Sequence, residues 1–421
     1  MALLPPCQLR LGDSAGEKRR RGQAMLPDGW KRSTVGSSCA IRNNLRMPLS
    51  AKDRGSMKGP YPYFGPTGQL DSIDHFRIDM PFALIGEDGD HFLKHGSRPM
   101  TLFFEGKANV NNHAHVIADS EQCLAKWFYY CFMHRDLTPV LTRQGVGRYK
   151  LTKAGLEQLE LALPPLAEQR SIVRLLETWD SAIEATERLL ANSRRQKEDL
   201  MSVLLRGQAG GRPDASSHRT VKLSSVFERV ARKNAEGNDN VLTISAQQGL
   251  ISQREFFSKS VASRDLSGYT LLRRGEFAYN KSYSTGYPFG AIKPLLAYEA
   301  GVVSSLYLCF KFRDGVDADP DFFRHYFEAG MLEQEIAGIA QEGARNHGLL
   351  NVGIDDFFGL QLKVPDVHTQ RQLASVLNTA EEEERSIAAQ LEKLRVEKRA
   401  IMAEVLTGRR RVRVQPTECT P

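Results

Sequence analysis

Residues 164–207 read PPLAEQRSIVRLLETWDSAIEATERLLANSRRQKEDLMSVLLRG, and the chain carries a second version of this stretch. The second version, PDVHTQRQLASVLNTAEEEERSIAAQLEKLRVEKRAIMAEVLTG, occupies residues 365–408 and aligns without gaps at a constant offset of 201 residues. A long internal repeat indicates the unit from which a fold is built. We therefore expect a duplicated architecture organised around these two segments.

Each copy is typical of one long helix. A proline stands at the entrance, the interior contains neither Gly nor Pro, and Gly207 or Gly408 stands where a left-handed C-cap residue is expected. A helix of about 40 residues, at 1.5 Å per residue, is about 60 Å long. Such a helix is long enough to hold two globular units apart.

Apolar residues recur at 3-4 spacing along both copies, which is the pattern of a coiled-coil seam. The polar interruptions coincide as well, at Lys197 and Lys398. We expect the two helices to pack against each other; the alternative is that each covers its own domain. The predicted seam consists of Ile172, Leu176, Trp179, Ile183, Leu190, Leu200, Leu204, Leu373, Leu377, Ile387, Leu391, Leu394, Ile401 and Val405.

The blocks before and between the helices have mixed character. Residues 302–312 resemble a strand, and aromatic residues at 126–133 and 322–327 favour helices. Both blocks end in an alternating apolar strand, at 159–163 and 360–364, directly before the proline that opens the long helix. We predict an α+β fold in which globular blocks alternate with long helices.

The composition excludes several classes of protein. The chain has 421 residues, enough for two domains, and its 41% hydrophobic and 25% charged residues are typical of a globular protein. No apolar run reaches the roughly 18 to 20 residues of a membrane span, and no secretory signal is evident, so we expect a cytoplasmic protein. Six scattered cysteines indicate neither a disulfide scaffold nor a zinc ribbon. The net charge of +7 permits a polyanionic partner.

Catalytic motifs are scarce. The sequence has no GxxxxGK[ST], GxGxxG or HExxH motif, and no Asn/Asp-Pro-Pro-aromatic tetrapeptide. Residues 12–16 fit GxSxG, but they lie in a short charged leader rather than between a strand and a helix. His113 with His115, and His91 with His95 in a Gly- and Asp-rich loop, lack further ligands nearby. We predict that the chain carries no catalytic site and no metal.

Basic residues mixed with aromatics favour nucleic acid. Arg reads guanine, Asn reads adenine, and Lys, Ser and Tyr hold phosphates, so loops that carry these residues have suitable chemistry. The alternative is an ordinary solvated loop. The candidate DNA-binding residues are Arg143, Arg148, Lys150, Lys153, Lys281, Tyr283, Arg345, Asn346 and His347.

The helix copies also carry a family resemblance. Residues 163–184 (LPPLAEQRSIVRLLETWDSAIE) and their degenerate copy at 364–378 (VPDVHTQRQLASVLN) resemble the duplicated conserved helices of the specificity subunit of type I restriction-modification systems. The segments LPDGWKRSTVG at 26–36, IGEDG at 85–89 and GKANVNNHAHVI at 106–117 resemble first-half recognition sequence of that family. The resemblance implies two target-recognition domains alternating with two helices that pair antiparallel.

Two features depart from the family pattern. The residues before Met25 have no counterpart, so translation could begin at Met25. The second helix has Asp-Val-His-Thr at 366–369 in place of Pro-Leu-Ala-Glu, and it places Glu384 on the seam. The domains that we expect are a leader at 1–24 that is non-native or disordered, recognition domain 1 at 25–163, spacer helix 1 at 164–208, recognition domain 2 at 209–363, spacer helix 2 at 364–408 and a basic tail at 409–421.

The family role implied by the resemblance is non-catalytic. Each recognition domain would read one half of a split site in double-stranded DNA, and the helices would dock two methylation subunits, with restriction and translocase subunits in the full complex. This chain would bind no cofactor, because S-adenosylmethionine, ATP and Mg would belong to the partners. The alternatives are a self-contained methyltransferase or nuclease with diverged motifs, and a coiled-coil scaffold that binds DNA without sequence preference.

Overall fold

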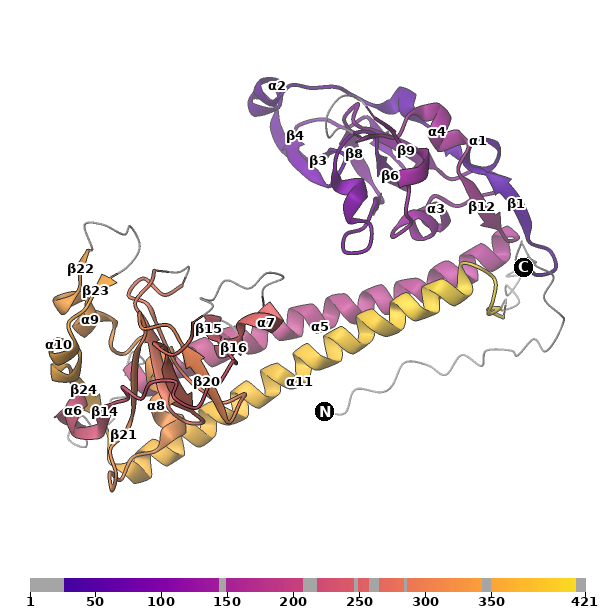
Figure 1. The fold of residues 1–421 in the computed structure, drawn as a ribbon. Coiled ribbons are helices and arrows are strands. Elements are labelled where there is room, and N and C mark those ends of the chain that lie inside the picture. The colour runs from indigo at the N-terminus through magenta and orange to yellow at the C-terminus, as the bar shows by residue number, and fades with distance from the viewer. Residues whose placement is uncertain are drawn as a thin grey trace. The chain divides into compact units, whose positions relative to one another are not determined.

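The computed structural model describes residues 26–143, 149–206, 218–245, 249–256, 265–283, 286–342 and 350–413. The chain divides into two compact units: unit 1 comprises residues 1–186 and 390–421, and unit 2 comprises residues 187–389. The two predicted long helices are confirmed as α5 (Leu166–Arg206) and α11 (Val367–Val405), both drawn in Figure 1, and each contributes one half to each unit. In the described part of the chain, no helix combines the length and the apolar character needed to cross a bilayer.

Unit 1 contains two four-stranded sheets. The first has the order β2–β9–β6–β7, with β2 at Ala40–Ile41, β9 at Ala114–Ala118, β6 at Phe82–Gly86 and β7 at Thr101–Phe104. The second has the order β4–β3–β8–β5, with β3 at Lys58–Phe64, β4 at Gln69–Ile73, β5 at Ile78–Asp79 and β8 at Lys107–Val110.

Strand β6 joins two apolar cores because both of its faces are buried. Ala83 and Ile85 pack with helix α3 (Ala125–Phe132), whereas Phe82 and Leu84 belong to a separate cluster with the second sheet. Alternation along a strand sends successive side chains to opposite faces, so a fully apolar run such as FALIG suits a central strand. The first sheet is thereby covered on one face by α3 and on the other by β3, β5 and β8.

Unit 2 repeats this plan with a four-stranded sheet of order β14–β21–β18–β19 and a covering helix. The strands are β14 at Phe227–Arg229, β21 at Leu308–Phe312, β18 at Phe277–Asn280 and β19 at Ala291–Pro294, and the helix is α8 at Pro320–Glu328. Its core is aromatic: the Phe277 and Phe310 rings stack at 5.3 Å between centroids, and Phe227 meets Phe323 edge-on at 5.1 Å. Such pairs stabilise beyond the burial of their area.

The prediction of one strand-like run at 302–312 was wrong in its extent. The run is divided between β20 (Ala300–Val303) and β21, because a turn closes between them with a hydrogen bond from Tyr307 N to Ser304 O. Strand β20 pairs with β17 (Thr270–Arg273) rather than with the four-stranded sheet. The turn leaves Leu306 largely exposed, so an apolar residue here does not indicate strand.

The remaining elements are short. In unit 1 they are β1 (Lys31–Thr34), α1 (Val35–Ser38), α2 (Ala51–Ser56), β10 (Thr142–Arg143), β11 (Tyr149–Lys150), α4 (Lys153–Glu157) and β12 (Glu160–Leu163), with 3-10 helices at Asn43–Leu45, His91–Lys94 and Thr138–Val140. In unit 2 they are β13 (Arg219–Lys222), α6 (Leu223–Val226), β15 (Leu242–Ser245), β16 (Gly249–Ser252), α7 (Gln253–Phe256), α9 (Glu333–Ile339), β22 (Gln341–Glu342), β23 (Leu350–Asn351), α10 (Ile354–Gly359) and β24 (Gln361–Val364).

One buried glutamine per unit ties the start of each long helix to the aromatic helix of that unit. The Gln169 side chain accepts from Leu124 N at 3.0 Å and donates to Pro164 O at 2.9 Å. Gln370 accepts from Asp319 N at 3.0 Å and donates to Pro365 O at 2.9 Å. Leu124 and Asp319 are the N-cap residues of α3 and α8. The identity of these glutamines in the repeat therefore has a structural reason.

The polar interruptions of the seam are ion-paired across the two helices. Lys398 contacts Asp180 in unit 1, and Lys197 contacts Glu384 in unit 2. Glu384 also accepts from Arg194 Nε at 2.9 Å. Every predicted seam side chain is buried or half-buried. In unit 2 the helix halves run antiparallel, because Lys197 pairs with Glu384 whereas Met201, later in α5, packs in one cluster with Leu377, earlier in α11. In unit 1 Asp180 pairs with Lys398, and the earlier Ile172 shares a cluster with the later Val405.

The residues that follow α11 pack against the first described residues of unit 1 and against the start of α5. Glu168 is 2% exposed and accepts from Trp30 Nε1 at 3.0 Å, while Arg411 donates to it from Nε at 2.7 Å and from Nη2 at 2.9 Å. Gly408 has φ +72° and lies against the Pro27 ring, where a Cβ would come within 2.5 Å of the ring carbon. The carboxylate thus needs Arg411 to balance its buried charge.

Replacing Arg411 with Ala should destabilise unit 1 by about 1 to 3 kcal/mol, since the buried Glu168 carboxylate would keep only the indole donor. Thermal or urea unfolding of the full chain measures this, with Arg410→Ala as the control because Arg410 is an exposed cation on the same tail. Equal unfolding midpoints for the two variants would contradict this role for the tail.

Candidate nucleic-acid interface

In unit 1 the candidate residues gather at the hairpin formed by β10 and β11. Arg143 lies opposite Tyr149 in the pairing, with its guanidinium carbon 5.6 Å from the ring centroid and Nη2 3.5 Å from the phenol oxygen. The Arg143 side chain is exposed. Cation–π contact holds a guanidinium in place without neutralising its charge. Arg143 therefore keeps its capacity to bind a phosphate or a guanine edge.

Lys150, the last residue of the hairpin, is held by two acids. Its ammonium lies 3.1 Å from Glu87 Oε1 and 3.7 Å from Asp88 Oδ1. The hydrogen bond to Glu87 and the charges of both carboxylates raise the pKa of Lys150 above its ordinary value. Since its charge is already balanced, Lys150 is a weaker candidate for a phosphate contact than its position in the sequence suggested.

Glu87 and Asp88 connect Lys150 to two further residues, Arg46 and His113, which were not among the predicted DNA-binding residues. Arg46 Nη1 donates to Glu87 Oε2 at 2.7 Å, and His113 Nδ1 lies 3.0 Å from Asp88 Oδ2. The result is a chain of alternating charges, from Arg46 through Glu87 and Lys150 to Asp88, with the His113 ring in contact with Asp88 at its end. Carboxylates in such a cluster can accept from the amino groups of cytosine or adenine.

The other unit 1 candidates contribute less. Lys153 begins α4, with 62% of its side chain exposed and its ammonium 3.4 Å from Glu157. An exposed pair one helical turn apart is weak and leaves the lysine available. Arg148 lies outside the described residues.

In unit 2 the equivalent loop follows β18, the counterpart of β6 in the sheet order. Lys281 is half-buried, and its carbonyl accepts from Leu350 N at 2.9 Å, which ties the loop to the β22–β23 hairpin. The Tyr283 ring is 65% exposed, which makes it available for stacking. Arg345, Asn346 and His347 lie outside the described residues.

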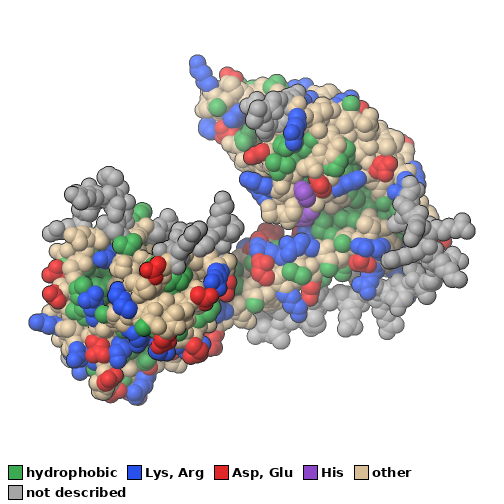
Figure 2. All heavy atoms as spheres, viewed as in Figure 1, with side chains coloured by type: hydrophobic (Ala, Val, Ile, Leu, Met, Phe, Trp, Pro, Cys, Tyr) green, Lys and Arg blue, Asp and Glu red, His purple; other side chains and the backbone are tan. Residues whose placement is uncertain are grey.

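The two loops differ in charge although they occupy the same place in the two units. The loop after β6 presents Glu87 and Asp88, whereas the loop after β18 presents Lys281 and Tyr283. On the face drawn in Figure 2, basic and acidic side chains are interspersed in both units rather than gathered into one basic field. The two units therefore differ in the side chains at these two loops, and not in the overall balance of basic and acidic residues on this face.

Among the histidines considered as metal ligands, His115 has a structural role. His115 is buried in β9, with Nδ1 2.9 Å from Asn43 Nδ2 and Nε2 donating to Leu151 O at 2.8 Å. This bond holds the segment that follows the hairpin against the sheet. Within the described ranges, no group of three or more His, Cys, Asp or Glu side chains is placed to hold a metal ion.

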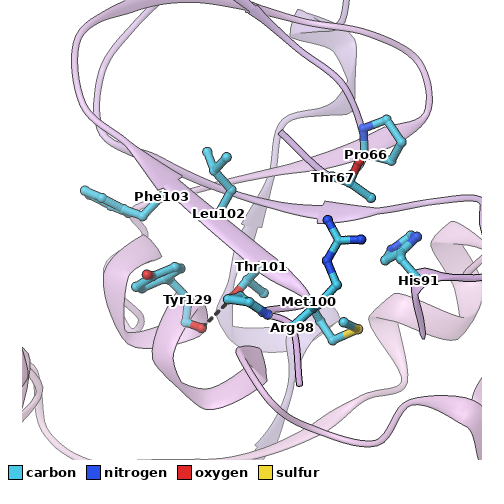
Figure 3. A pocket seen from close by; sticks show the side chains of 10 residues that line it. Pro66, Thr67, His91, Arg98, Met100, Thr101, Leu102, Phe103 and Tyr129 are labelled. Atoms are coloured by element: carbon cyan, nitrogen blue, oxygen red, sulfur yellow. Dashed lines mark hydrogen bonds between the residues drawn. The ribbon is translucent and has the colours of Figure 1, made fainter. Parts of the chain in front are cut away.

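His91 lines a cavity of about 270 Å³ in unit 1, drawn in Figure 3. Figure 3 shows Arg98 extending toward Thr67 and His91, and the Thr101 hydroxyl donates to Tyr129 O at 2.8 Å. The His91 ring is packed so closely that a Cβ on Gly86 would lie 2.6 Å from Nε2. Burial is the main reason that the pKa of His91 is lowered.

Comparison with known proteins gives one family match, one relative and two similar solved structures. Residues 27–192 match the family described as type I restriction modification DNA specificity domain. A Haemophilus influenzae protein named as a type I restriction enzyme specificity subunit is 34% identical over 137 residues, a match that spans 32% of this chain and 34% of that protein. The crystal structure of a type I restriction-modification system S subunit from M. genitalium covers 91% of this chain and 98% of its own, with 12% identity and a TM-score of 0.56.

A further solved chain, from a study of complex assembly and conformational transition of the type I restriction-modification system, is also similar. It covers 92% of this chain and 100% of its own, with 15% identity and a TM-score of 0.51. At these identities the likeness shows the fold, and it extends over both units.

Acidification should destabilise the chain in the window below pH ~6.5. Burial lowers the pKa of His91, His115 and His325, so the folded state favours their neutral forms while the unfolded chain takes up protons near pH 6.5. Stability is therefore complete above that pH and falls below it, by at most about 1.4 kcal/mol per pH unit for each histidine.

Urea unfolding between pH 7 and pH 5 tests this expectation. Replacement of His134 by Gln is the control, because it removes an exposed histidine and leaves the three buried ones in place. A free energy of unfolding that stays constant across this window would show that the buried histidines do not titrate as described.

Proposed function

We propose that this chain, whose residues 27–192 match the type I restriction modification DNA specificity domain family, is the DNA-recognition subunit of a type I restriction-modification complex. It would read an asymmetric site in two separate parts, one with each unit. The chain itself would be non-catalytic, and base contacts from the loop ends would supply sequence choice while phosphate contacts supply register.

The observation that carries this proposal is one structural plan used twice with different loop ends. Each unit has a four-stranded sheet, a covering aromatic helix, a hairpin and a glutamine-anchored long helix. A scaffold that binds DNA without sequence preference has no need for such different chemistry at equivalent loops. Two unlike readers on one repeated frame suit a site with two unlike halves.

The partners follow from the same proposal. Two methylation subunits would dock on the long helices, and restriction or translocase subunits would join the complex. S-adenosylmethionine, ATP and Mg would bind those partners, which would carry out methyl transfer, translocation and cleavage in the cytoplasm. The residues of this chain would bind and orient DNA.

Co-expression with the methylation subunit encoded nearest to this chain tests the proposal directly. Long-read sequencing of the host genome should reveal one bipartite adenine-methylation motif with a fixed gap, which disappears when this chain is deleted. Methyl transfer by the purified chain alone would instead support a self-contained methyltransferase and would refute a non-catalytic role.

Arg143→Ala and Lys281→Ala should each weaken binding of the assembled complex to its target DNA by roughly tenfold, and each should affect a different half of the site. If Lys281 contacts a phosphate, its loss should also reduce the slope of log affinity against log salt by about 1. Arg219→Ala, which removes an exposed cation of β13 that belongs to neither loop end and to neither long helix, is the control. Equal effects of all three on both halves would argue against these contacts.

Exchanging residues 218–363 for another recognition block should alter only one half of the methylated motif. The measurement is the same genome-wide map of methylated adenines. A change in both halves would mean that the two units do not read DNA independently.

A further inference from the structure

The contact between aromatic helix and long helix uses the same positions in both units but different chemistry. The glutamine contacts align Leu124 with Asp319, so Lys126 corresponds to Asp321 and Tyr130 to His325. On the long helices the 201-residue offset makes Glu177 correspond to Asn378, and Asp180 to Glu381. The two interfaces can therefore be compared position by position.

In unit 1 the long helix presents acids and the aromatic helix presents donors. The Lys126 ammonium pairs with Glu177, and the Tyr130 hydroxyl donates to Asp180 Oδ2 at 2.6 Å. Lys398 of α11 contacts the other Asp180 oxygen and lies 5.6 Å from the Tyr130 ring centroid. Tyr130 is 1% exposed and Lys398 is 9% exposed, so these groups have little water to replace a lost partner.

In unit 2 the charge at the position of Lys126 is reversed, because Asp321 takes its place on the aromatic helix. Asp321 on the aromatic helix accepts from Asn378 Nδ2 at 3.0 Å, and the ring of the buried His325 lies with Nε2 2.8 Å from Asn378 Oδ1. Arg324 then bridges to the long helix, donating to Asn378 Oδ1 at 2.7 Å and to Glu381 Oε2 at 2.6 Å. Burial alone would raise the pKa of Glu381, but Arg324 and Arg385 hold it below its ordinary value.

We propose that these two contacts determine which recognition block can pack on which long helix. We call the two sets of contacting residues the matching code. The first half of α5 accepts a helix with a cation and a hydroxyl at positions i and i+4, and the first half of α11 accepts one with an acid, an arginine and a histidine. A block with the α8 pattern placed on α5 would set Asp321 against Glu177, and these two carboxylates and Asp180 would have Arg324 as the only cation that the block supplies. A block with the α3 pattern on α11 would lose the partner of Lys126.

The code selects the kind of block that each position can receive. Tyr130, His325 and Lys398 are buried and Arg324 is partly buried, so a lost partner penalises these groups most, whereas the exposed Asp321 contributes less. Like charges brought together add to the penalty. The code is independent of DNA binding. If the proposed function holds, it also fixes the order of the two half-sites in the target.

A charge-exchange cycle on the full chain tests the code. Asn378→Glu removes the amide that donates to Asp321 and adds a third carboxylate to Asp321 and Glu381 around the single Arg324, so it should lower the melting temperature by at least about 2 °C. The double variant Asn378→Glu with Asp321→Lys restores the cation–carboxylate pair of unit 1 and should recover most of the loss. Glu198→Lys, an exposed charge change on α5, should have little effect. A double variant no more stable than Asn378→Glu would overturn the proposal.

Block exchange provides the second readout. In one full-length chain, residues 25–163 and 209–363 trade places; in a second, Glu177 with Asn378 and Asp180 with Glu381 are exchanged as well. The second chain should unfold cooperatively at a higher temperature than the first, whether or not either chain supports DNA methylation. Equal unfolding of the two chains would refute the code, while loss of DNA recognition alone would count only against the proposed function.

Discussion

In each unit the structure depends on a single buried glutamine, because its side chain connects the long helix, the aromatic helix and the proline that follows the preceding strand. Gln169 and Gln370 are essentially inaccessible to solvent, and each satisfies the N-terminus of an aromatic helix while bonding the carbonyl of the proline before the long helix. A buried amide left without these partners would be costly, so the position of the aromatic helix along the long helix is closely restricted. The sheet packs on that helix, and the loop ends extend from the sheet.

The buried glutamine contact also explains how the same fold can present different loop residues in the two units. Residues that hold the frame lie in the sheet cores and at the helix contact, whereas Glu87 and Asp88 of unit 1 and Lys281 and Tyr283 of unit 2 lie beyond the ends of central strands. Changes at such loop positions cost little folding energy because loops tolerate substitution while the scaffold keeps its packing. Function can therefore vary at the loops without altering Gln169, Gln370 or the strands that they position.

Much of the frame could be read from the sequence because it follows local periodicity. The 3-4 spacing predicts both long helices, and the shared glutamine lies at a repeat identity. The turn within 302–312 was missed because Leu306 continues the apolar run yet is exposed. The cluster around Lys150 could not be predicted, since Arg46 and Glu87 are 41 residues apart and meet only through sheet packing. The DNA contacts themselves stay a prediction.

The seam shows why polar residues persist in an otherwise apolar helix pair. Lys398 with Asp180 and Lys197 with Glu384 satisfy each other only in the observed register, because each lysine is separated from its acid by any slip of the helices. A partly buried ion pair contributes little net stability compared with apolar residues, but a mismatched one is strongly penalised. The pairs thus discriminate against wrong registers rather than adding strength. Glu384, which departs from the apolar pattern, is required at that position because Lys197 lies opposite it.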